Sequence, residues 1–230
     1  MYLITPDFGC ILFIQALPTH DTFGNHLPAS GVSFIDRSTG KADRLEADLI
    51  RRARAGDEAA YESLMREHQE AVFRLAYLFL GSAADAEDVA QEVFIKALNA
   101  LDRFDDSRPL RPWLLSITAN CARNRRRAFG RYVAALRRLI VPETSYAEGA
   151  VTEVDARMEA QALWQAVRRL SAADQEVIYL RYFLELSVSE AAEAMKVEPG
   201  TVKSRLSRAL SRLREVIERD FPLLYEGRGT

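Results

Sequence analysis

Residues that could bind nucleic acid are concentrated near the carboxyl end of the chain. In the stretch 200-GTVKSRLSRALSRLRE-215, five basic residues are interspersed with three serines. Long cationic side chains bind phosphate groups, and short hydroxyl-bearing side chains can reach base edges. From Lys196 to Arg214 there are six basic residues and one acid, Glu198. This composition indicates binding to a polyanion, although a solvated basic face with no partner would show it too.

A helix is the element that would give these residues a common face. At 100° per residue the apolar residues of the stretch fall on one side, and Thr201, Ser204 and Arg208 lie on the opposite side. Arg205 and Arg212 then line one flank of the outward face. The apolar side is expected to pack into a core, which leaves the hydroxyl and guanidinium groups outside.

A second, shorter helix is expected just before the basic one. Ser187 and Glu190 form an S-x-x-E capping box, the residues 196-KVEP-199 turn the chain, and Pro199 suits the first turn of the helix that follows. Two short helices across a tight turn, the second of them basic, are typical of a helix-turn-helix whose second helix enters the major groove. Tight helical hairpins in other all-α proteins share this pattern.

An acidic helix is expected at 85-DAEDVAQEVFIKALNAL-101. Its face opposite the apolar stripe carries Asp88, Gln91, Glu92, Ile95 and Asn99. An isoleucine among acids on the solvent side favours a protein contact that covers it, although single exposed apolar residues are common.

A further helix, 109-PLRPWLLSITANCARNRRR-127, has a different surface. Trp113, Ile117, Cys121 and Ala128 are expected to line one side, with Arg123 and Arg126 pointing away from it. Arginine neutralises phosphates, asparagine addresses base edges, and an aromatic ring can stack on an unpaired base. Trp113 fits either a core anchor or such a stacking platform. The flank beside Trp113 carries Asn120, Asn124 and Arg127.

Composition sets limits on the class of protein. The chain has 230 residues, 48% hydrophobic content and a net charge of −2, but nine acids face two arginines over 57–92 and ten arginines face two aspartates over 103–138. This segregation indicates two kinds of partner. The two cysteines and three histidines show no metal-ligand spacing, and no phosphate loop or nucleophile elbow is present. The apolar run 8–17 is too short for a membrane span, so we expect no membrane segment. Because catalytic motifs and a cysteine framework are both missing from the sequence, we expect a non-enzymatic cytoplasmic protein.

The helical periodicity predicts an all-α fold of two small domains joined by an acidic flexible linker, the second domain containing the helix-turn-helix. Helices are expected near 43–55, 57–80, 84–101 and 110–128. The boundaries that follow are a poorly ordered N-terminal extension over 1–42, a first domain over 43–139, a linker over 140–154, a second domain over 155–220 and a tail over 221–230.

Four motifs in this order resemble those of the extracytoplasmic-function (ECF) sigma factors of the sigma-70 family. They are D-A-E-D-V-A-Q-E-V-F from Asp85, W-L-L-S-I-x-x-N from Trp113, S-x-x-E-A-A from Ser187 and G-T-V-K-S-R-L-S-R-A from Gly200. The resemblance covers roughly residues 43–220. It implies a transcription initiation factor without chemistry or cofactor of its own, which binds the β′ clamp and β flap of core RNA polymerase and directs it to promoter DNA. It also implies sequestration by an anti-sigma factor.

The resemblance assigns the candidate sites to three surfaces, with sigma region 2 over 43–139 and sigma region 4 over 155–220. Polymerase would be bound by Asp88, Gln91, Glu92 and Ile95. The −10 element would be bound by Asn120, Arg123, Asn124, Arg126 and Arg127, with the loop 101–112 capturing a flipped base. The −35 element would be bound by Thr201, Lys203, Ser204, Arg205, Arg208 and Arg212.

Three features depart from the family pattern. Lys196 stands where a glycine of the helix-turn-helix turn is usual, so that a non-glycine residue would need a positive φ. Asn124 replaces a frequent aspartate, and the extension over 1–42 has no counterpart.

A helix-turn-helix regulator that binds operator DNA without polymerase is the alternative interpretation, and a polymerase-binding surface on 85–101 would separate the two.

Overall fold

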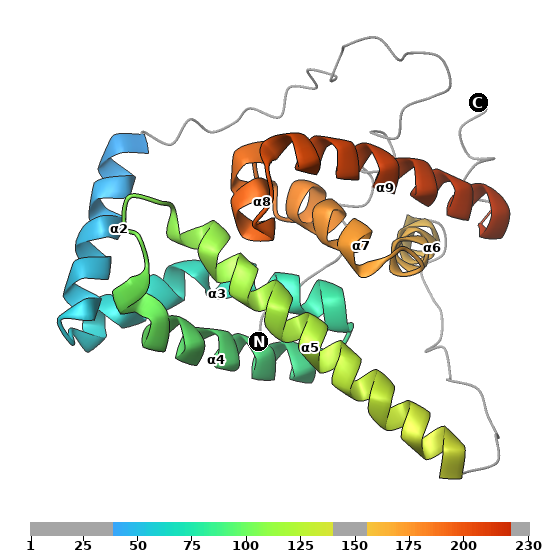
Figure 1. Cartoon of the computed structure of the whole chain (residues 1–230), viewed down its shortest axis with the longest axis horizontal. Coiled ribbons are helices and arrows are strands. Elements are labelled where there is room, and N and C mark those ends of the chain that lie inside the picture. The colour runs from blue at the N-terminus through green and yellow to red at the C-terminus, as the bar shows by residue number, and fades with distance from the viewer. Residues whose placement is uncertain (1–38, 140–155, 222–230) are drawn as a thin grey trace.

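The computed structural model describes residues 39–139 and 156–221, and every regular element in these two ranges is helical (Figure 1). The all-α prediction is confirmed. In the first range the elements are α2 (Thr39–Arg54), α3 (Glu58–Leu80), α4 (Ala83–Ala100), the short 3-10 turn η1 (Leu101–Arg103) and α5 (Leu110–Leu139). In the second range they are α6 (Ala156–Arg168), α7 (Ala172–Ile178), the π-helical turn η2 (Tyr179–Phe183), α8 (Val188–Met195) and α9 (Pro199–Asp220).

Local side-chain caps fix where the helices of the first domain begin and end. Asp57 accepts from the Ala60 N–H at 3.1 Å at the start of α3, and Ser82 caps α4 in the same way. Gly81 ends α3 in the left-handed region, with φ 73°, and its N–H donates to the Tyr77 carbonyl. A short, sharp turn therefore joins α3 to α4.

The helix α5 is buried on more than one side, which the sequence pattern did not predict. Leu114, Leu115, Ala119 and Ala122 are buried, whereas Ala128, expected on the apolar side, is exposed. The reason is that α5 packs against α3 and α4 with one side and against α8 with another. A single apolar stripe describes only a helix with one buried face. The helix also continues to Leu139, beyond the expected end near 128.

Side-chain caps also fix the helix starts of the second domain, including the start predicted at Ser187. Ser171 caps α7 by accepting from the Asp174 N–H at 3.2 Å. Ser187 and Glu190 form the complete capping box of α8, because the Ser187 hydroxyl accepts from the Glu190 N–H and the Glu190 carboxylate accepts from the Ser187 N–H. Most of the extension over 1–42, the linker over 140–154 and the tail after Phe221 lie outside the described residues, although α2 already begins at Thr39.

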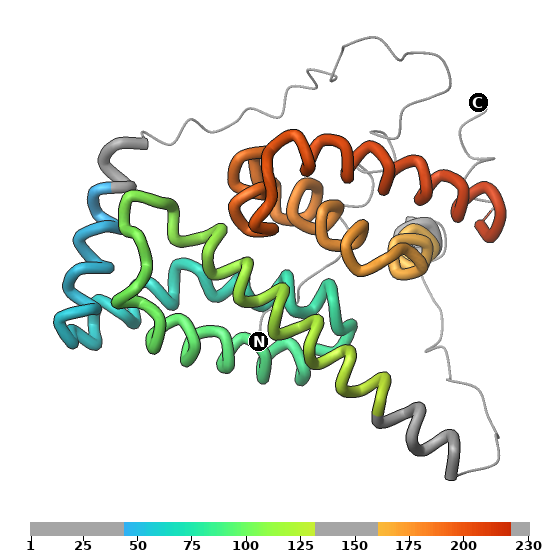
Figure 2. Tube along the Cα trace, in the orientation of Figure 1, coloured from blue at the N-terminus to red at the C-terminus, as the bar shows by residue number. Residues whose placement is uncertain are grey.

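The two domains pack against each other. α8 contacts α5, and the π-helical turn η2 contacts α3. Figures 1 and 2 show the second domain lying along the first, with α8 and α9 above α5. The rings of Phe79 and Tyr179 meet edge to face with centroids 5.3 Å apart, so the two hydrophobic cores are in contact. In neither described range is there a helix both long and apolar enough to span a bilayer.

Candidate nucleic-acid and polymerase interfaces

The helix-turn-helix has the predicted geometry. Lys196 ends α8 in the left-handed region with φ 54°, as the departure from the usual glycine required, and Pro199 occupies the first turn of α9. Val202, Ala209, Leu213 and Ile217 of α9 are buried. The packed core beneath these residues therefore holds the opposite face of α9 towards solvent.

The candidate −35 residues divide by exposure. Lys203, Ser204 and Arg208 are exposed, while Thr201 and Arg205 are partly buried. The Ser204 hydroxyl donates to the Thr201 carbonyl at 3.2 Å, and the Arg208 Nε donates to the Ser204 carbonyl at 3.1 Å. These exposed bonds are local to the helix, so a phosphate or base edge can replace them at small cost.

Arg212 has an acidic partner on another helix. Its Nη1 lies 2.8 Å from the Asp174 Oδ2, and the Asp174 side chain is only 4% exposed. The cation at Arg212 is therefore paired within the protein. The acid comes from α7, and counting acids along α9 could not find it.

Two of the candidate −10 arginines, Arg123 and Arg126, have partners in the second domain. Arg123 forms an ion pair with Glu176, and the Arg126 Nη1 donates to the Gln175 Oε1 at 2.8 Å. Arg123 also donates to the Asn120 Oδ1 at 2.6 Å. Arg123 is partly buried and Arg126 is exposed, so both lie away from the buried side of α5 as expected, but each meets a side chain of the second domain. The remaining candidates on α5, Asn124 and Arg127, are exposed.

The electrostatics at Glu176 follow from this contact. Its side chain is 4% exposed, and burial raises the pKa of the carboxyl group. Arg123 and Arg205 oppose that shift because each cation favours the ionised form. Removing either arginine would therefore raise the pKa of Glu176 further.

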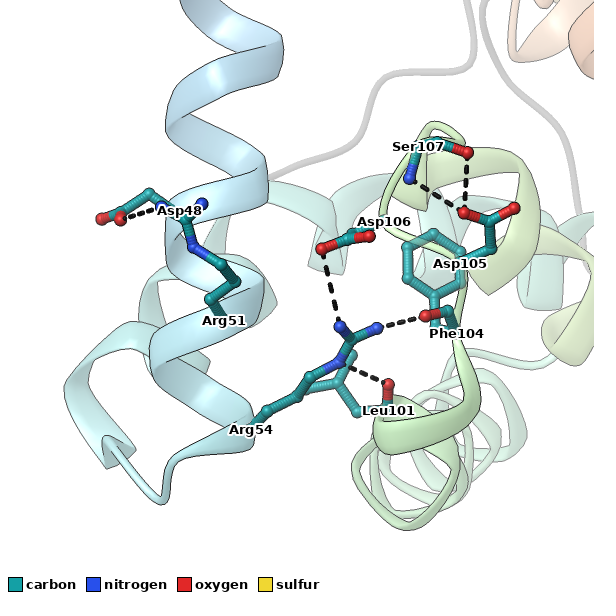
Figure 3. Close-up of polar contacts among 8 residues, drawn as sticks. All are labelled: Asp48, Arg51, Arg54, Leu101, Phe104, Asp105, Asp106 and Ser107. Atoms are coloured by element: carbon teal, nitrogen blue, oxygen red, sulfur yellow. Dashed lines mark hydrogen bonds and ion pairs between the residues drawn. The ribbon is translucent and has the colours of Figure 1, made fainter.

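The loop between α4 and α5 is braced by Arg54 of α2 (Figure 3). The Arg54 Nε donates to the Leu101 carbonyl at 3.0 Å, its Nη2 donates to the Phe104 carbonyl, and its Nη1 lies 3.6 Å from the Asp106 carboxylate. The Asp105 carboxylate accepts from the Ser107 N–H and hydroxyl. The loop therefore has a fixed backbone shape without being part of a long helix.

Trp113 lies where this loop meets the second domain. It is half-buried, and its ring packs against Phe104 with centroids 4.7 Å apart. Both rings line a cleft of about 730 Å³, which is also lined by Arg103 and Arg108 and by the turn residues Lys196 and Pro199. Trp113 thus anchors the loop and presents part of its ring to an open space.

The acidic helix α4 has the predicted apolar residue on its surface. Ile95 is 63% exposed, and Leu98, one turn further along, is 48% exposed. Leu98 was not among the candidates, although its i+3 spacing from Ile95 was visible in the sequence. Glu92 accepts from the Lys96 Nζ at 2.5 Å, which lowers the pKa of the Glu92 carboxyl, and Asp88 accepts from Arg125 at 2.6 Å. Exposed Gln91 completes the set.

No group of three or more His, Cys, Asp or Glu side chains in the part of the chain that the structure describes is arranged to hold a metal ion.

Comparison with known proteins shows the family. The Sigma-70 region 2 family matches residues 64–132, and the Sigma-70, region 4 family matches residues 160–213. The RNA polymerase sigma factor NccH of Alcaligenes xylosoxydans xylosoxydans is 35% identical over 173 residues, which are 74% of this chain and 93% of NccH. The chain belongs to the ECF sigma factors of the sigma-70 family.

Two other relatives support the membership. The ECF RNA polymerase sigma factor SigW of Bacillus subtilis is 31% identical over 175 residues, covering 72% of this chain and 93% of SigW. Among solved structures, CnrH in complex with the cytosolic domain of CnrY matches with a TM-score of 0.57 at 27% identity, covering 76% of this chain and 99% of CnrH. CnrH is a sigma factor of Cupriavidus metallidurans.

The chain is therefore a sigma factor, a transcription initiation factor that directs RNA polymerase to promoters. The region 2 match spans the candidate polymerase and −10 residues on α4 and α5, and the region 4 match spans the helix-turn-helix. The predicted family is confirmed. The brace residue Arg54 on α2 lies outside both matched ranges and had no signal in the motifs.

Proposed function

We propose that this sigma factor uses two domains with separate tasks. The first, over residues 43–139, would bind core RNA polymerase and the −10 element, and the second, over 155–220, would bind the −35 element. Residues 140–154 would link them, and 1–42 and 221–230 would be an extension and a tail. The positions of the two family matches within these ranges support the division.

The polymerase-binding surface that we propose is centred on Ile95. Its exposed side chain shares the surface of α4 with the polar candidates Asp88, Gln91 and Glu92, so an apolar anchor lies beside polar residues. The β′ clamp of core polymerase is the proposed partner. Leu98 enlarges the apolar part of the surface.

For the −10 element we propose α5 and the loop before it. Asn120 and Asn124 can address base edges, while Arg123, Arg126 and Arg127 can bind the backbone. The braced loop with Phe104 and Trp113 would hold an unstacked base. Capturing such a base lowers the free energy of melted DNA, so strand opening needs no hydrolysis of ATP.

For the −35 element we propose the outward face of α9, with Thr201, Lys203, Ser204, Arg205 and Arg208. The observation that carries this assignment is the rigid support of that face by the buried residues Val202 and Ala209. Such a helix can enter the major groove as one body. The pairing of Arg212 with Asp174 favours a supporting role for Arg212 rather than a base contact. Contact between this domain and the β flap is part of the proposal.

The remaining partner that we propose is an anti-sigma factor. The likeness to CnrH, solved in complex with the cytosolic domain of CnrY, supports it. We propose that the chain works in the cytoplasm by binding alone, since its site residues are assigned to contacts and none to a reaction.

Run-off transcription tests the function. Purified core polymerase, with and without the chain, is given a library of duplexes with randomised −10 and −35 positions, and the transcripts are sequenced. We expect promoter-dependent transcripts only with the chain. Operator binding without any such transcript, from a chain that is folded by circular dichroism, would contradict it.

A further inference from the structure

The loop between α4 and α5 is held by α2, a helix that is not adjacent to it in the sequence. α2 packs against α3, and its residues Ile50 and Ala53 are buried, so the helix itself is firmly seated. Two oppositely charged residues of α2, Arg54 and Glu46, reach the two ends of the loop. Neither residue lies within the ranges that match the sigma-70 family. The support of the loop therefore includes a helix that the family motifs do not cover.

Arg54 holds the first end of the loop at three points (Figure 3). Its Nε donates to the Leu101 carbonyl at 3.0 Å, its Nη2 donates to the Phe104 carbonyl, and its Nη1 lies 3.6 Å from the Asp106 Oδ2. The Arg54 side chain is only 24% exposed. Because a guanidinium group presents its donors in a rigid fork, this one side chain fixes the loop backbone at two carbonyls at once.

Glu46 holds the other end of the loop. Its Oε2 accepts from the Leu110 N–H at 3.2 Å, where α5 begins, and its Oε1 lies 3.2 Å from the Nε2 of buried His68. The first N–H groups of a helix have no partner within the helix, so a carboxylate at this place satisfies one of them and stabilises the start of α5. The segment 101–110 is therefore tied at both ends to one helix.

These ties bear on the residues that are proposed to hold a base. Phe104 carries a carbonyl bound by Arg54 and a ring that packs against Trp113 with centroids 4.7 Å apart. Ordering a mobile backbone on binding costs free energy, and a loop that is already ordered avoids this loss. A contact that fixes the backbone of Phe104 should therefore strengthen binding of a base beside its ring.

We propose that Arg54 and Glu46 are positioning residues for promoter melting, which hold the segment 101–110 from α2 in the shape that receives an unstacked base of the −10 element. The inference rests on the proposed function, since it takes this loop as the base-binding element. Both side chains act through the backbone of the loop and are assigned no contact with DNA. Loss of either should weaken capture of that one base and leave binding of the other bases unchanged.

Removal of single bases measures the capture one nucleotide at a time. Polymerase holoenzyme is titrated with a fluorescent single strand carrying the −10 sequence selected in the transcription assay, either intact or abasic at one position in turn. For the wild type, loss of the captured base should weaken binding about tenfold, as expected for one stacked base. Arg54→Met should bind the intact strand about fivefold more weakly, and loss of that base should then cost only about twofold more. The effects at all other positions should equal those of the wild type.

A second ion pair of α2 supplies matched controls (Figure 3). The Arg51 Nη2 donates to the Asp48 Oδ1 at 2.8 Å, within the same helix. Arg51→Met and Asp48→Ala should keep the tenfold effect of the captured base, whereas Glu46→Ala should reduce it at the same position as Arg54→Met does. A full effect in Glu46→Ala would overturn the role of Glu46.

Affinity for core polymerase distinguishes positioning from misfolding. Each variant should bind core within about twofold of the wild type, because the proposed polymerase surface lies on α4. If Arg54→Met does not assemble, Arg54→Lys keeps the charge without the fork, and the effect of the captured base should fall to about threefold.

Two failures are distinguishable. If the Arg54 variant lowers affinity by the same factor for every strand, intact or abasic, the positioning role is overturned. If no abasic position weakens binding of the wild type, base capture itself is absent, and the proposed function of the loop fails.

Discussion

At the scale of single residues, the arginines of α9 differ in what surrounds them. Arg212 is held by the buried Asp174, whereas Arg208 is exposed and donates to a carbonyl of its own helix. Releasing Arg212 would leave a buried carboxylate without its partner, which is costly. Arg208 can replace its local bond by a bond to a base edge, so we expect Arg208 to recognise the base sequence.

Substitutions at Lys203 and Arg208 distinguish binding of the DNA backbone from recognition of the base sequence. Lys203→Ala should weaken binding to all −35 sequences alike and lower the salt slope by about one, while Arg208→Ala should cost about 1–3 kcal/mol and relax preference at one base pair. Polymerase holoenzyme is titrated against duplexes that differ at single −35 positions, at two salt concentrations. If Arg208→Ala lowers affinity equally for every duplex, Arg208 is a phosphate contact.

Ile95 is expected to dominate binding to core polymerase. Ile95→Arg places a charge where the partner surface would be apolar, so affinity for core polymerase should fall by at least about tenfold, the effect of a central interface residue. The fold should be unaffected because the side chain is 63% exposed. Gln69→Arg, at an exposed position on α3, is the control. Equal affinities of the two variants, measured by competition, would remove Ile95 from the interface.

At the scale of helices, the turn of the helix-turn-helix contains a strained residue. Lys196 has φ 54° and ψ 48°, a conformation that costs a residue with a Cβ about 1–2 kcal/mol. Lys196→Gly should therefore raise the free energy of unfolding by up to about 1 kcal/mol, after the entropy cost of glycine is subtracted. Lys196→Ala keeps the Cβ and should show no such gain in urea unfolding. Equal stability of the two variants would contradict the strain.

The packing of α2 depends on one carboxylate. Glu46 accepts from the His68 Nε2 at 3.2 Å and from the Leu110 N–H at 3.2 Å, which ties α2 to α3 and to the start of α5. Burial by itself would raise the pKa of Glu46, but these two bonds together hold the pKa below its usual value of 4.5.

The sign of the pH effect follows. A lowered pKa means that ionised Glu46 stabilises the fold above the unfolded value, 4.5, and that this part of the stability disappears as the pH falls through the lower folded value. Glu46→Gln should cost about 1–2 kcal/mol at pH 7, with the difference from the wild type shrinking towards pH 3. Glu67→Gln, at an exposed carboxylate, is the control in urea unfolding across that range. A pH-independent difference would contradict the role of the charge.

The sequence predicted those features of the fold and site that depend on near neighbours. The cap at Ser187, the buried side of α9 and the exposed Ile95 each depend on residues within a few positions, and all are found. The partners of Arg123 and Arg126 lie 53 and 49 residues away, on a short helix of another domain. Periodicity reports which side of a helix is apolar but carries no information on which distant side chain meets it.

At the scale of the whole molecule, a cluster of aromatic rings joins the two halves. Tyr179 lies in its middle, 5.3 Å from Phe79 of the first domain and 5.8 Å from both Trp164 and Phe183 of the second, measured between ring centroids. Its side chain is fully buried, and burial raises its pKa strongly. A tyrosine therefore occupies the junction, although the ring of a phenylalanine would fill nearly the same space.

The Tyr179 hydroxyl is expected to reduce stability. Within the described residues it has no hydrogen-bond partner, and a buried, unsatisfied hydroxyl costs about 1–3 kcal/mol. Tyr179→Phe should therefore raise the free energy of unfolding of the full chain by about 1 kcal/mol, since the ring contacts remain. Tyr61→Phe makes the same chemical change at a hydroxyl that donates to the Phe94 carbonyl, and it should lower stability by about 1 kcal/mol. Urea unfolding of both variants gives the comparison. A loss of stability in Tyr179→Phe would mean that the hydroxyl is hydrogen-bonded in solution, and the junction would then differ from the one described.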